Sequence, residues 1–197
     1  MVFGDFMNTI CLMRHGETDA NKKFIVQGRM DNPLNDYGRF QAKRTGEYLV
    51  RNHEEFDLVV SSPLKRAYET AKLVVAEFHS PKVILINSDL TERNFGDYDG
   101  KKIDEEYARL VTTDQIPNME KNRDLESRVL HALQVLCDKN PEKKILVVVH
   151  SHVIKAVLVQ LLPAFTYTSY LFNCSLNYLS YDQGSFQVLA HNINPLE

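Results

Sequence analysis

Ionisable side chains follow three apolar runs of this sequence. They are Arg14 and His15 after residues 9–13, Arg66 after residues 57–61, and His150 and His152 after residues 145–149. Arginine stays charged at neutral pH and its planar guanidinium matches the oxygens of an oxyanion, whereas imidazole titrates near neutral pH. Gly16, next to His15, would let the chain turn close to a bound anion. These residue types indicate an anion-binding pocket that holds a reactive histidine.

A tetrahedral dianion such as a phosphoryl group suits this set of side chains. Arg14 and Arg66 at one site would repel each other unless an anion lay between them. The helices predicted to follow two of the runs add backbone N–H donors at their N-termini. Neighbouring positive charge lowers the pKa of an imidazole, which would keep His15 neutral and nucleophilic toward phosphorus. Glu92 is the candidate acid for the leaving oxygen if the pocket raises its pKa.

Four segments are predicted to form the strands that deliver these residues: 9–13, 57–61, 83–86 and 145–149. Three of the four are continuous apolar runs, which is typical of parallel strands covered on both faces. In an open α/β sheet, ligands bind beyond the carboxyl ends of the strands. We therefore expect the ionisable residues after these strands, including Glu92, to meet at one edge of the sheet.

Helical spacing of apolar residues separates the predicted strands. Helices are expected at about 36–52 with Asn35 as the N-cap, from about 64 with an apolar stripe over 67–78, around the apolar stripe 125–136, and at 152–162, where Pro163 ends the last one. Two alternating stretches around residues 182–184 predict a hairpin near the end of the sequence. This order predicts an α/β fold, a three-layer α/β/α sandwich with a mostly parallel sheet and an antiparallel edge strand.

The segment 90–122 breaks the alternation of strands and helices. It carries "RNFGDYDGKK" and then a short helical pattern near residues 102–110. The length of 197 residues is typical of one domain. We predict a single domain over residues 1–197, with a small cap or insertion at about 93–122 that shapes the substrate pocket.

The composition argues against several classes of partner. The formal net charge is −3, so no global basic field exists to hold nucleic acid or an anionic membrane. The first stretch, "MVFGDFMNTICLM", lacks the basic region of a signal peptide, and the apolar run 153–162 is too short to span a bilayer. Cys11, Cys137 and Cys174 lie far apart, which favours reduced thiols in a cytoplasmic protein. Any anion site must therefore be local.

Five blocks of the sequence resemble, in order and spacing, the histidine phosphatase superfamily of phosphoglycerate mutase-like proteins. They are "LMRHGETDAN", "QGRMDNPLNDYGRFQA", "SSPLKRAYETA", "LTERNFGDYDG" and "VVVHSHVIKAVL", within roughly residues 9–160. The resemblance implies the phosphoglycerate mutase-like fold and a ping-pong mechanism that needs neither a metal nor another cofactor. It also implies that His15 is the phosphorylated nucleophile and Glu92 the proton donor. The residues implied to bind the phosphoryl group are Arg14, Arg66 and His150.

The resemblance implies further residues around the substrate phosphate: Thr18, Asn21, Gln27, Gly28, Ser151 and His152. The last two depart from the family, which usually has two glycines after the second histidine. Ser151 keeps a backbone N–H that can contact phosphate. His152 has two possible roles, as a pocket wall that contacts substrate or as a buried core histidine.

Two features favour the phosphatase branch of the family. Only 58 positions separate Glu92 from His150, where the mutases carry a longer insertion, and Phe95 stands where the mutases have a tyrosine. A shorter cap admits water, which turns phosphoryl transfer into hydrolysis. We predict a metal-independent phosphomonoester hydrolase that acts on a small phosphorylated metabolite, as a monomer or a homodimer.

Several other functions remain alternatives from the sequence alone. Phosphoglycerate mutase-type transfer and dephosphorylation of a phosphoprotein would use the same residues. The sequence His150-Ser151-His152 can chelate zinc, but no nearby Asp–His pair completes the site and two arginines oppose a cation. A non-enzymatic module that binds a phosphorylated ligand has no support, because every reactive position carries a competent residue.

Overall fold

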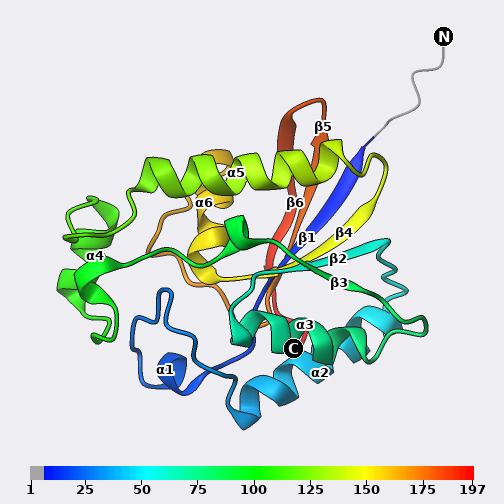
Figure 1. Cartoon of the computed structure of the whole chain (residues 1–197), viewed down its shortest axis with the longest axis horizontal. Helices are drawn as coiled ribbons and strands as arrows, with labels where there is room; N and C mark the ends of the chain where they lie inside the picture. Colours follow the sequence, from blue (N-terminus) through cyan, green and yellow to red (C-terminus); the bar gives the residue numbers. More distant parts are fainter. Residues whose placement is uncertain (1–6) are drawn as a thin grey trace.

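A six-stranded sheet runs through the middle of the molecule (Figure 1). The computed structural model describes residues 7–197, so residues 1–6, with the first part of the stretch that predicts no signal peptide, lie outside the described residues. The strands are β1 (Asn8–Arg14), β2 (Leu58–Ser61), β3 (Ile84–Ile86), β4 (Lys144–Val149), β5 (Leu176–Asp182) and β6 (Ser185–Ile193). They lie within a few residues of the predicted positions.

The strand order across the sheet is β3-β2-β4-β1-β5-β6. The first four of these run parallel, β5 is antiparallel to β1, and β6 is antiparallel to β5. The predicted α/β sandwich with a mostly parallel sheet and an antiparallel edge is confirmed. The antiparallel strand β5 lies one place in from the edge, because the hairpin adds two strands there.

Two pairs of helices cover the two faces of the sheet (Figure 1). They are α2 (Asp36–Arg51) with α3 (Lys65–Val75) on one face, and α5 (Asn122–Asp138) with α6 (Ser151–Leu161) on the other. The side chain of Asn35 caps α2 by accepting a hydrogen bond from the backbone N–H of Gly38. Helix α3 ends before Phe78, so that residue lies beyond the helix predicted for it. The sequence prediction missed α1 (Asp19–Lys22) and the short 3-10 helix η1 (Ser88–Leu90).

Strand β1 shows why the central runs are continuously apolar. Ile10 and Leu12 pack in the cluster formed with α5 and α6, while Cys11 and Met13 pack in the cluster formed with α2 and α3. Successive residues of a strand point to opposite faces, so a strand covered on both faces needs apolar residues throughout. The expectation that helices cover both faces of the strand is confirmed for β1 and β4.

The expectation that β3 is buried on both faces is wrong. This strand has three residues and forms one edge of the sheet. Leu85 and Ile86 are 46% and 52% exposed. The apolar run there reflects the preference of branched side chains for strands and not burial.

The segment predicted as a cap contains η2 (Gly96–Tyr98) and α4 (Glu105–Thr112). It shares a small apolar cluster, the cap cluster, with the loop after α1: Val26, Phe95, Tyr98, Tyr107, Val111, Ile116 and Met119. The two segments are also joined by an isolated bridge between Ile25 and Lys102. The loop after α1 and the cap therefore form one packed unit, while the division of the chain into a single domain with a cap stays a prediction.

Two further expectations concern the cysteines and the helices. Cys11, Cys137 and Cys174 are buried free thiols. Among residues 7–197, no helix is long and apolar enough to cross a lipid bilayer.

Candidate active site

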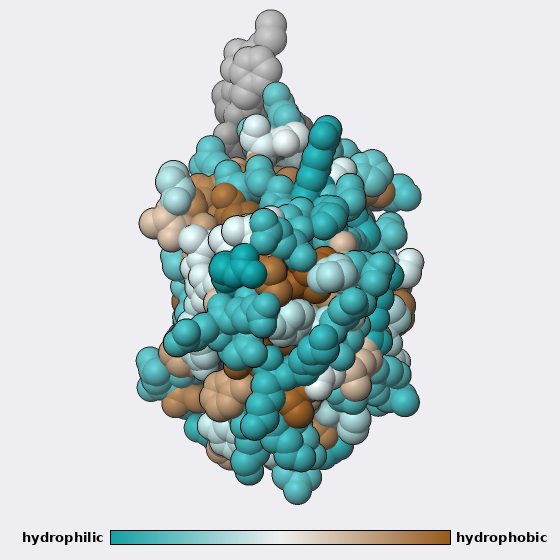
Figure 2. Space-filling view, turned by 90° about the vertical axis from the view of Figure 1, so that its left-hand side faces the viewer, coloured by the Kyte–Doolittle hydropathy of each residue, from teal (hydrophilic) through white to brown (hydrophobic). Residues whose placement is uncertain are grey.

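A cavity of about 500 Å³ opens beyond the carboxyl ends of β1, β2 and β4. Residues of α1 and α4 border it, and Figure 2 shows the molecule from their side, with hydrophobic side chains emerging between hydrophilic ones. All but two of the predicted site residues line the cavity. They are Arg14, His15, Asn21, Gln27, Gly28, Arg66, Glu92, Ser151 and His152. Thr18 and His150 are buried and do not line it.

The backbone after β1 fixes the place of His15. Its N–H donates to the carbonyl oxygen of Val149 at 3.0 Å, so the pairing with β4 continues one residue beyond β1. The N–H of Gly16 donates to Oγ1 of Thr70 at 3.0 Å. A Cβ atom at Gly16 would lie 2.4 Å from the carbonyl oxygen of Gly38, so only glycine permits this contact with α2. Close packing of two backbones is enough to require this glycine, and its closeness to a bound anion stays a prediction.

His15 has a defined proton position. Its Nδ1 lies 2.7 Å from the carbonyl oxygen of Gly16, which can only accept, so Nδ1 carries the proton. Nε2 accepts a hydrogen bond from Nε of Arg66 at 3.2 Å and holds the lone pair. Burial lowers the pKa of His15 well below its ordinary value, and the charges of Arg66 and Arg14 add to the shift. The imidazole is therefore neutral at neutral pH. Burial contributes more to this than the neighbouring positive charge that the sequence led us to expect as the cause.

Arg66 and Arg14 bring two guanidinium groups to the cavity. Arg66 donates to the carbonyl oxygens of Gly28 at 2.8 Å and Met30 at 2.7 Å, besides the bond described above, which leaves two of its five N–H groups unused. Burial lowers the pKa of Arg66 to about 10, so it stays charged at neutral pH. Arg14 donates to Leu171 O at 2.5 Å, and its buried Nε has no partner within residues 7–197. These unused donors suit an oxyanion.

Glu92 is a buried carboxyl that follows η1. Its Oε1 accepts the N–H of Arg93 at 2.8 Å, and its Oε2 accepts the N–H of His152 at 3.3 Å. Burial raises the pKa of Glu92 above its ordinary value, against the opposing effect of these N–H groups and of Arg66 and Arg14. This is the direction that an acid for the leaving oxygen requires.

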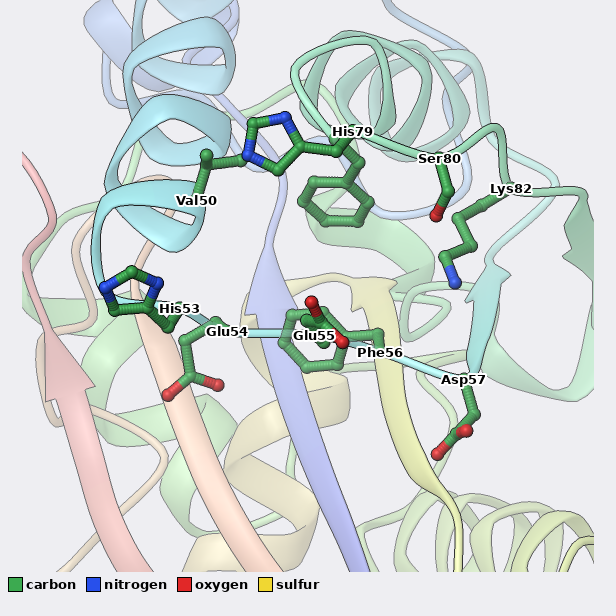
Figure 3. A pocket seen from close by; sticks show the side chains of 10 residues that line it. Val50, His53, Glu54, Glu55, Phe56, Asp57, His79, Ser80 and Lys82 are labelled. Carbon is green, nitrogen blue, oxygen red and sulfur yellow. The ribbon is translucent and has the colours of Figure 1, made fainter.

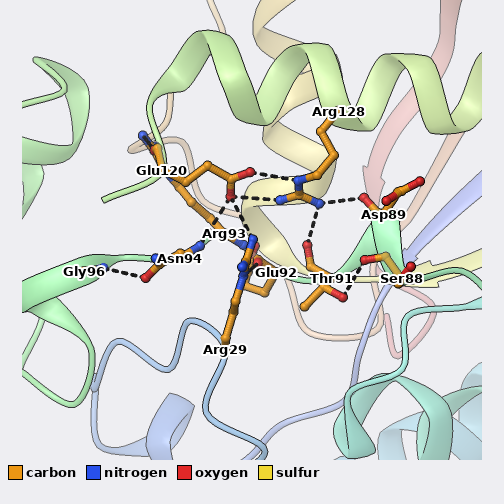
Figure 4. A network of polar contacts seen from close by, with 10 residues as sticks. All are labelled: Arg29, Ser88, Asp89, Thr91, Glu92, Arg93, Asn94, Gly96, Glu120 and Arg128. Atoms are coloured by element: carbon orange, nitrogen blue, oxygen red, sulfur yellow. Dashed lines mark hydrogen bonds and ion pairs between the residues drawn. The ribbon is translucent and has the colours of Figure 1, made fainter. Parts of the chain in front are cut away.

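An ion-pair network holds the segment that carries Glu92 (Figure 4). Arg128 of α5 makes a two-pronged contact with Glu120, at 2.8 and 2.9 Å, and donates to the carbonyl oxygen of Thr91 at 3.0 Å. Arg29 donates to the carbonyl oxygen of Glu92 at 3.4 Å. The backbone on both sides of Glu92 is thus tied to α5 and to the loop after α1.

His150 lies directly behind His15, with 5.2 Å between the ring centroids. Its Nε2 lies 2.7 Å from Oγ of Ser62, and its Nδ1 has no partner in the described part of the chain. Burial and the charge of Arg66 lower the pKa of His150 well below its ordinary value. The sequence prediction missed Ser62. The parallel pairing of β2 with β4, which sets their next residues side by side, could have indicated it.

Thr18 acts on the cavity through two neighbours. Its Oγ1 lies 2.9 Å from Oε1 of Gln27 and 3.1 Å from Oδ1 of Asn21. Asn173, a cavity residue that the sequence prediction missed, also donates to Oδ1 of Asn21 at 3.3 Å. Because the amide oxygens are held by the protein, the amide NH₂ groups of Asn21 and Gln27 are the donors left for a ligand.

A family model now settles the relationship of the chain to known proteins. The model of the histidine phosphatase superfamily (branch 1) matches residues 10–194. The chain belongs to this superfamily. The resemblance seen in the five sequence blocks is confirmed, and it extends through β6.

Two relatives of this chain cover most of its length. The uncharacterized phosphatase PhoE of Bacillus subtilis (strain 168) is 36% identical over 192 residues, which are 95% of this chain and 96% of that protein. The phosphoglycerate mutase-like protein 4 of Arabidopsis thaliana is 35% identical over 179 residues, which are 85% of this chain and 77% of that protein. Membership and relatives together make this chain a phosphatase or a mutase.

A solved structure of a phosphatase is also similar to this chain. The phosphoserine phosphatase of Entamoeba histolytica in complex with 3-phosphoglyceric acid shares 26% identity and superposes with a TM-score of 0.79, over 94% of this chain and 97% of that one. That neighbour therefore binds a small phosphorylated acid.

His152 departs from the glycine that histidine phosphatases usually have. It is 4% exposed, and its ring stacks on Tyr167 with 5.3 Å between centroids and meets the edge of Phe95 at 4.7 Å. Its Nε2 lies 3.4 Å from the hydroxyl oxygen of Tyr107. Burial lowers the pKa of His152 well below its ordinary value. Both expected roles apply in part, because the buried ring forms the cavity wall and packs against the cap.

A second cavity, of about 360 Å³, lies near the amino end of β2, at the end of the strands opposite to the candidate active site (Figure 3). His53, Glu54, Glu55, Asp57, His79 and Lys82 are among the residues that line it, and among the described residues its lining includes no arginine. This cavity does not share the chemistry of the candidate active site.

The His150-Ser151-His152 sequence does not converge on one point. His150 bonds Ser62, whereas the ring of His152 faces Tyr107. Within residues 7–197, no group of three or more His, Cys, Asp or Glu side chains is arranged to hold a metal ion. This arrangement does not favour the zinc-site alternative.

Proposed function

We propose that the chain is a metal-independent phosphomonoester hydrolase that forms a phosphohistidine on His15 and acts on a small phosphorylated metabolite. The geometry of His15 carries the proposal: a neutral ring whose Nε2 lone pair lies beside Arg66 in a cavity lined by two arginines. Such a nitrogen is a nucleophile for phosphorus, and the arginines match the charge of the phosphoryl oxygens.

The proposed reaction has two steps. Nε2 of His15 forms a bond to phosphorus while the bond to the ester oxygen breaks, and protonated Glu92 gives its proton to that oxygen. Ionised Glu92 then takes a proton from water, whose oxygen bonds to phosphorus as the P–N bond breaks. Inorganic phosphate leaves, and both side chains return to their starting protonation states. Arg14 and Arg66 stabilise the phosphoryl charge in both steps.

Hydrolysis is favoured over mutase-type transfer by the features that distinguish the two branches. The connection from Glu92 to His150 is shorter than the resemblance implies for the mutases, and Phe95 stands where it implies a tyrosine in the mutases. The name of the Bacillus subtilis relative, a phosphatase that spans the same length, supports this choice. The bound 3-phosphoglyceric acid of the Entamoeba histolytica neighbour supports a small phosphorylated substrate.

We also infer a single domain over residues 1–197 with a cap at about 93–122, acting in the cytoplasm as a monomer or homodimer. The cap cluster, which joins the cap to the loop after α1, supports the single domain. The three buried free thiols support a reducing compartment.

We expect the purified protein to release phosphate from p-nitrophenyl phosphate and from 3-phosphoglycerate, and to keep its full rate after dialysis against a chelator. Two assays check this: phosphate release with and without EDTA, and interconversion of 2- and 3-phosphoglycerate. Interconversion with little phosphate release would identify a mutase instead. Loss of activity in EDTA that added zinc restores would contradict the metal-independent mechanism.

The rate should depend on pH through His15 and Glu92. We expect kcat/KM to rise as pH increases through the lowered pKa of His15, because only the neutral imidazole attacks. It should fall as pH increases through the raised pKa of Glu92, because only the protonated carboxyl gives a proton. A pH profile with glycerol 3-phosphate, an alkyl ester whose leaving oxygen needs a proton, measures both limbs once it is corrected for the ionisation of the ester.

The Glu92→Gln variant is the control for this assignment. It should lose the alkaline fall and keep the acidic rise, since only the group at position 92 has been made non-titrating. An unchanged alkaline fall in that variant would show that another group causes it.

A further inference from the structure

Lys155 is a buried cation in the wall of the candidate active site. It lies in α6, one turn after Ser151, and lines the same cavity as His15. The residue is 8% exposed. Lysine is seldom buried so deeply without an opposite charge, because removal of an ammonium group from water is costly.

The ammonium group of Lys155 has a single protein partner. Its Nζ donates to the carbonyl oxygen of Tyr167 at 2.7 Å, and it takes part in none of the ion pairs found among residues 7–197. Two of its three N–H donors are therefore unused. The nearby charge of Arg14 disfavours its charged form, and Glu92, the carboxyl group that would favour it when ionised, already accepts two backbone N–H groups. Burial lowers the pKa of Lys155 to about 7, which reflects the missing counter-charge.

The other residues near the mouth of the cavity are poorly suited to bind an anion besides the phosphoryl group. Phe24, Ile103 and Tyr170 line the cavity and are 69%, 48% and 68% exposed, so they form an apolar rim. Lys22 is the other lysine on the wall, and it is exposed, so water screens its charge. Among the described residues that line the cavity, Lys155 is thus a buried cation besides the two arginines that we assign to the phosphoryl group.

We propose that Lys155 binds a carboxylate carried by the leaving group of the substrate, which makes phosphomonoesters of hydroxy acids the preferred substrates. This inference rests on the proposed function, because it assigns Arg14 and Arg66 to the phosphoryl group and Lys155 to the other end of the molecule. A carboxylate at that place would accept the two unused N–H groups and supply the counter-charge that the protein lacks.

Two esters that differ at one position test the proposal. 3-Phosphoglycerate carries a carboxylate where glycerol 3-phosphate carries a hydroxymethyl group. We expect Lys155→Met to lower the ratio of kcat/KM for 3-phosphoglycerate to that for glycerol 3-phosphate roughly 10- to 100-fold, mainly through a higher KM for 3-phosphoglycerate, as loss of a charge-assisted hydrogen bond predicts. Lys155→Arg should restore most of the ratio, and Lys22→Met should keep it.

Other results of this experiment would overturn either the role of Lys155 or the proposed function. Equal losses for both esters in Lys155→Met would overturn the proposal, because they would indicate a role in folding or at the phosphoryl group. Should that variant fold poorly, Lys155→Gln, which can still donate to the carbonyl oxygen of Tyr167, must show the same fall in the ratio. A wild-type protein that releases phosphate from neither ester would overturn the proposed function itself, whereas an active protein with an unchanged ratio in the variants overturns the role of Lys155 alone.

Discussion

Replacement of His15 by alanine is expected to lower kcat for phosphate release at least ~10⁴-fold, because the variant has no nitrogen that can bond to phosphorus. Arg14, Arg66 and Glu92 remain in place, so the variant should still bind phosphorylated ligands. The measurement is the rate of phosphate release from p-nitrophenyl phosphate. Mass spectrometry of the intact protein, quenched without acid, should show one phosphoryl group on the wild-type chain and none on the variant.

His79→Ala is the matched control for this substitution. His79 lies in the wall of the second cavity, near the amino end of β2 and away from the candidate active site. Its loss should therefore leave phosphate release intact. A His15→Ala variant that kept a substantial fraction of wild-type activity would contradict the assignment of the nucleophile. Equal activity losses in both histidine variants would point to a folding defect, which the thermal midpoints of the two proteins would reveal.

Glu92→Gln is expected to have the second largest effect, and the effect should depend on the leaving group. With an alkyl phosphate the leaving oxygen needs a proton, so we expect kcat to fall about 10²- to 10⁴-fold. p-Nitrophenolate leaves without protonation, so the first step with that ester should be less affected. Breakdown of the phosphohistidine still lacks its base, and rapid-mixing measurements should therefore show a burst of p-nitrophenol.

Asp89→Asn is the control, because this exposed carboxylate belongs to the same segment and only its carbonyl oxygen contacts Arg128. It should behave as the wild-type protein does with both esters. A Glu92→Gln variant that lost the same fraction of activity with both esters, and showed no burst, would exclude Glu92 as the general acid.

The fold could be predicted where local pattern and burial agree. The continuous runs of β1 and β4 require helices on both faces, and Asn35 marks the start of α2 to the residue. The error at β3 arose because a short branched run has the same appearance in an edge strand as in a buried one. Which strand occupies an edge depends on the order of pairing, and no local pattern of residues states that order.

The candidate site could be predicted where the rule for strand ends applies. That rule alone brings Arg14, His15, Arg66 and His150 together from three separate parts of the sequence. It cannot reveal contacts that depend on side-chain packing across the fold. The burial of Lys155 is of this kind, since nothing about a lysine in the sequence signals it.

The cap cluster is separate from the two apolar clusters that cover the sheet, although it forms one wall of the cavity. Under the proposed function, substitutions within it alter the cavity wall on the side of the leaving group, while the strands that carry His15 and His150 keep their packing. Effects at separate clusters tend to add without interfering. If the proposed function holds, changes in the cap alter which phosphorylated compounds fit the cavity while the catalytic residues stay the same.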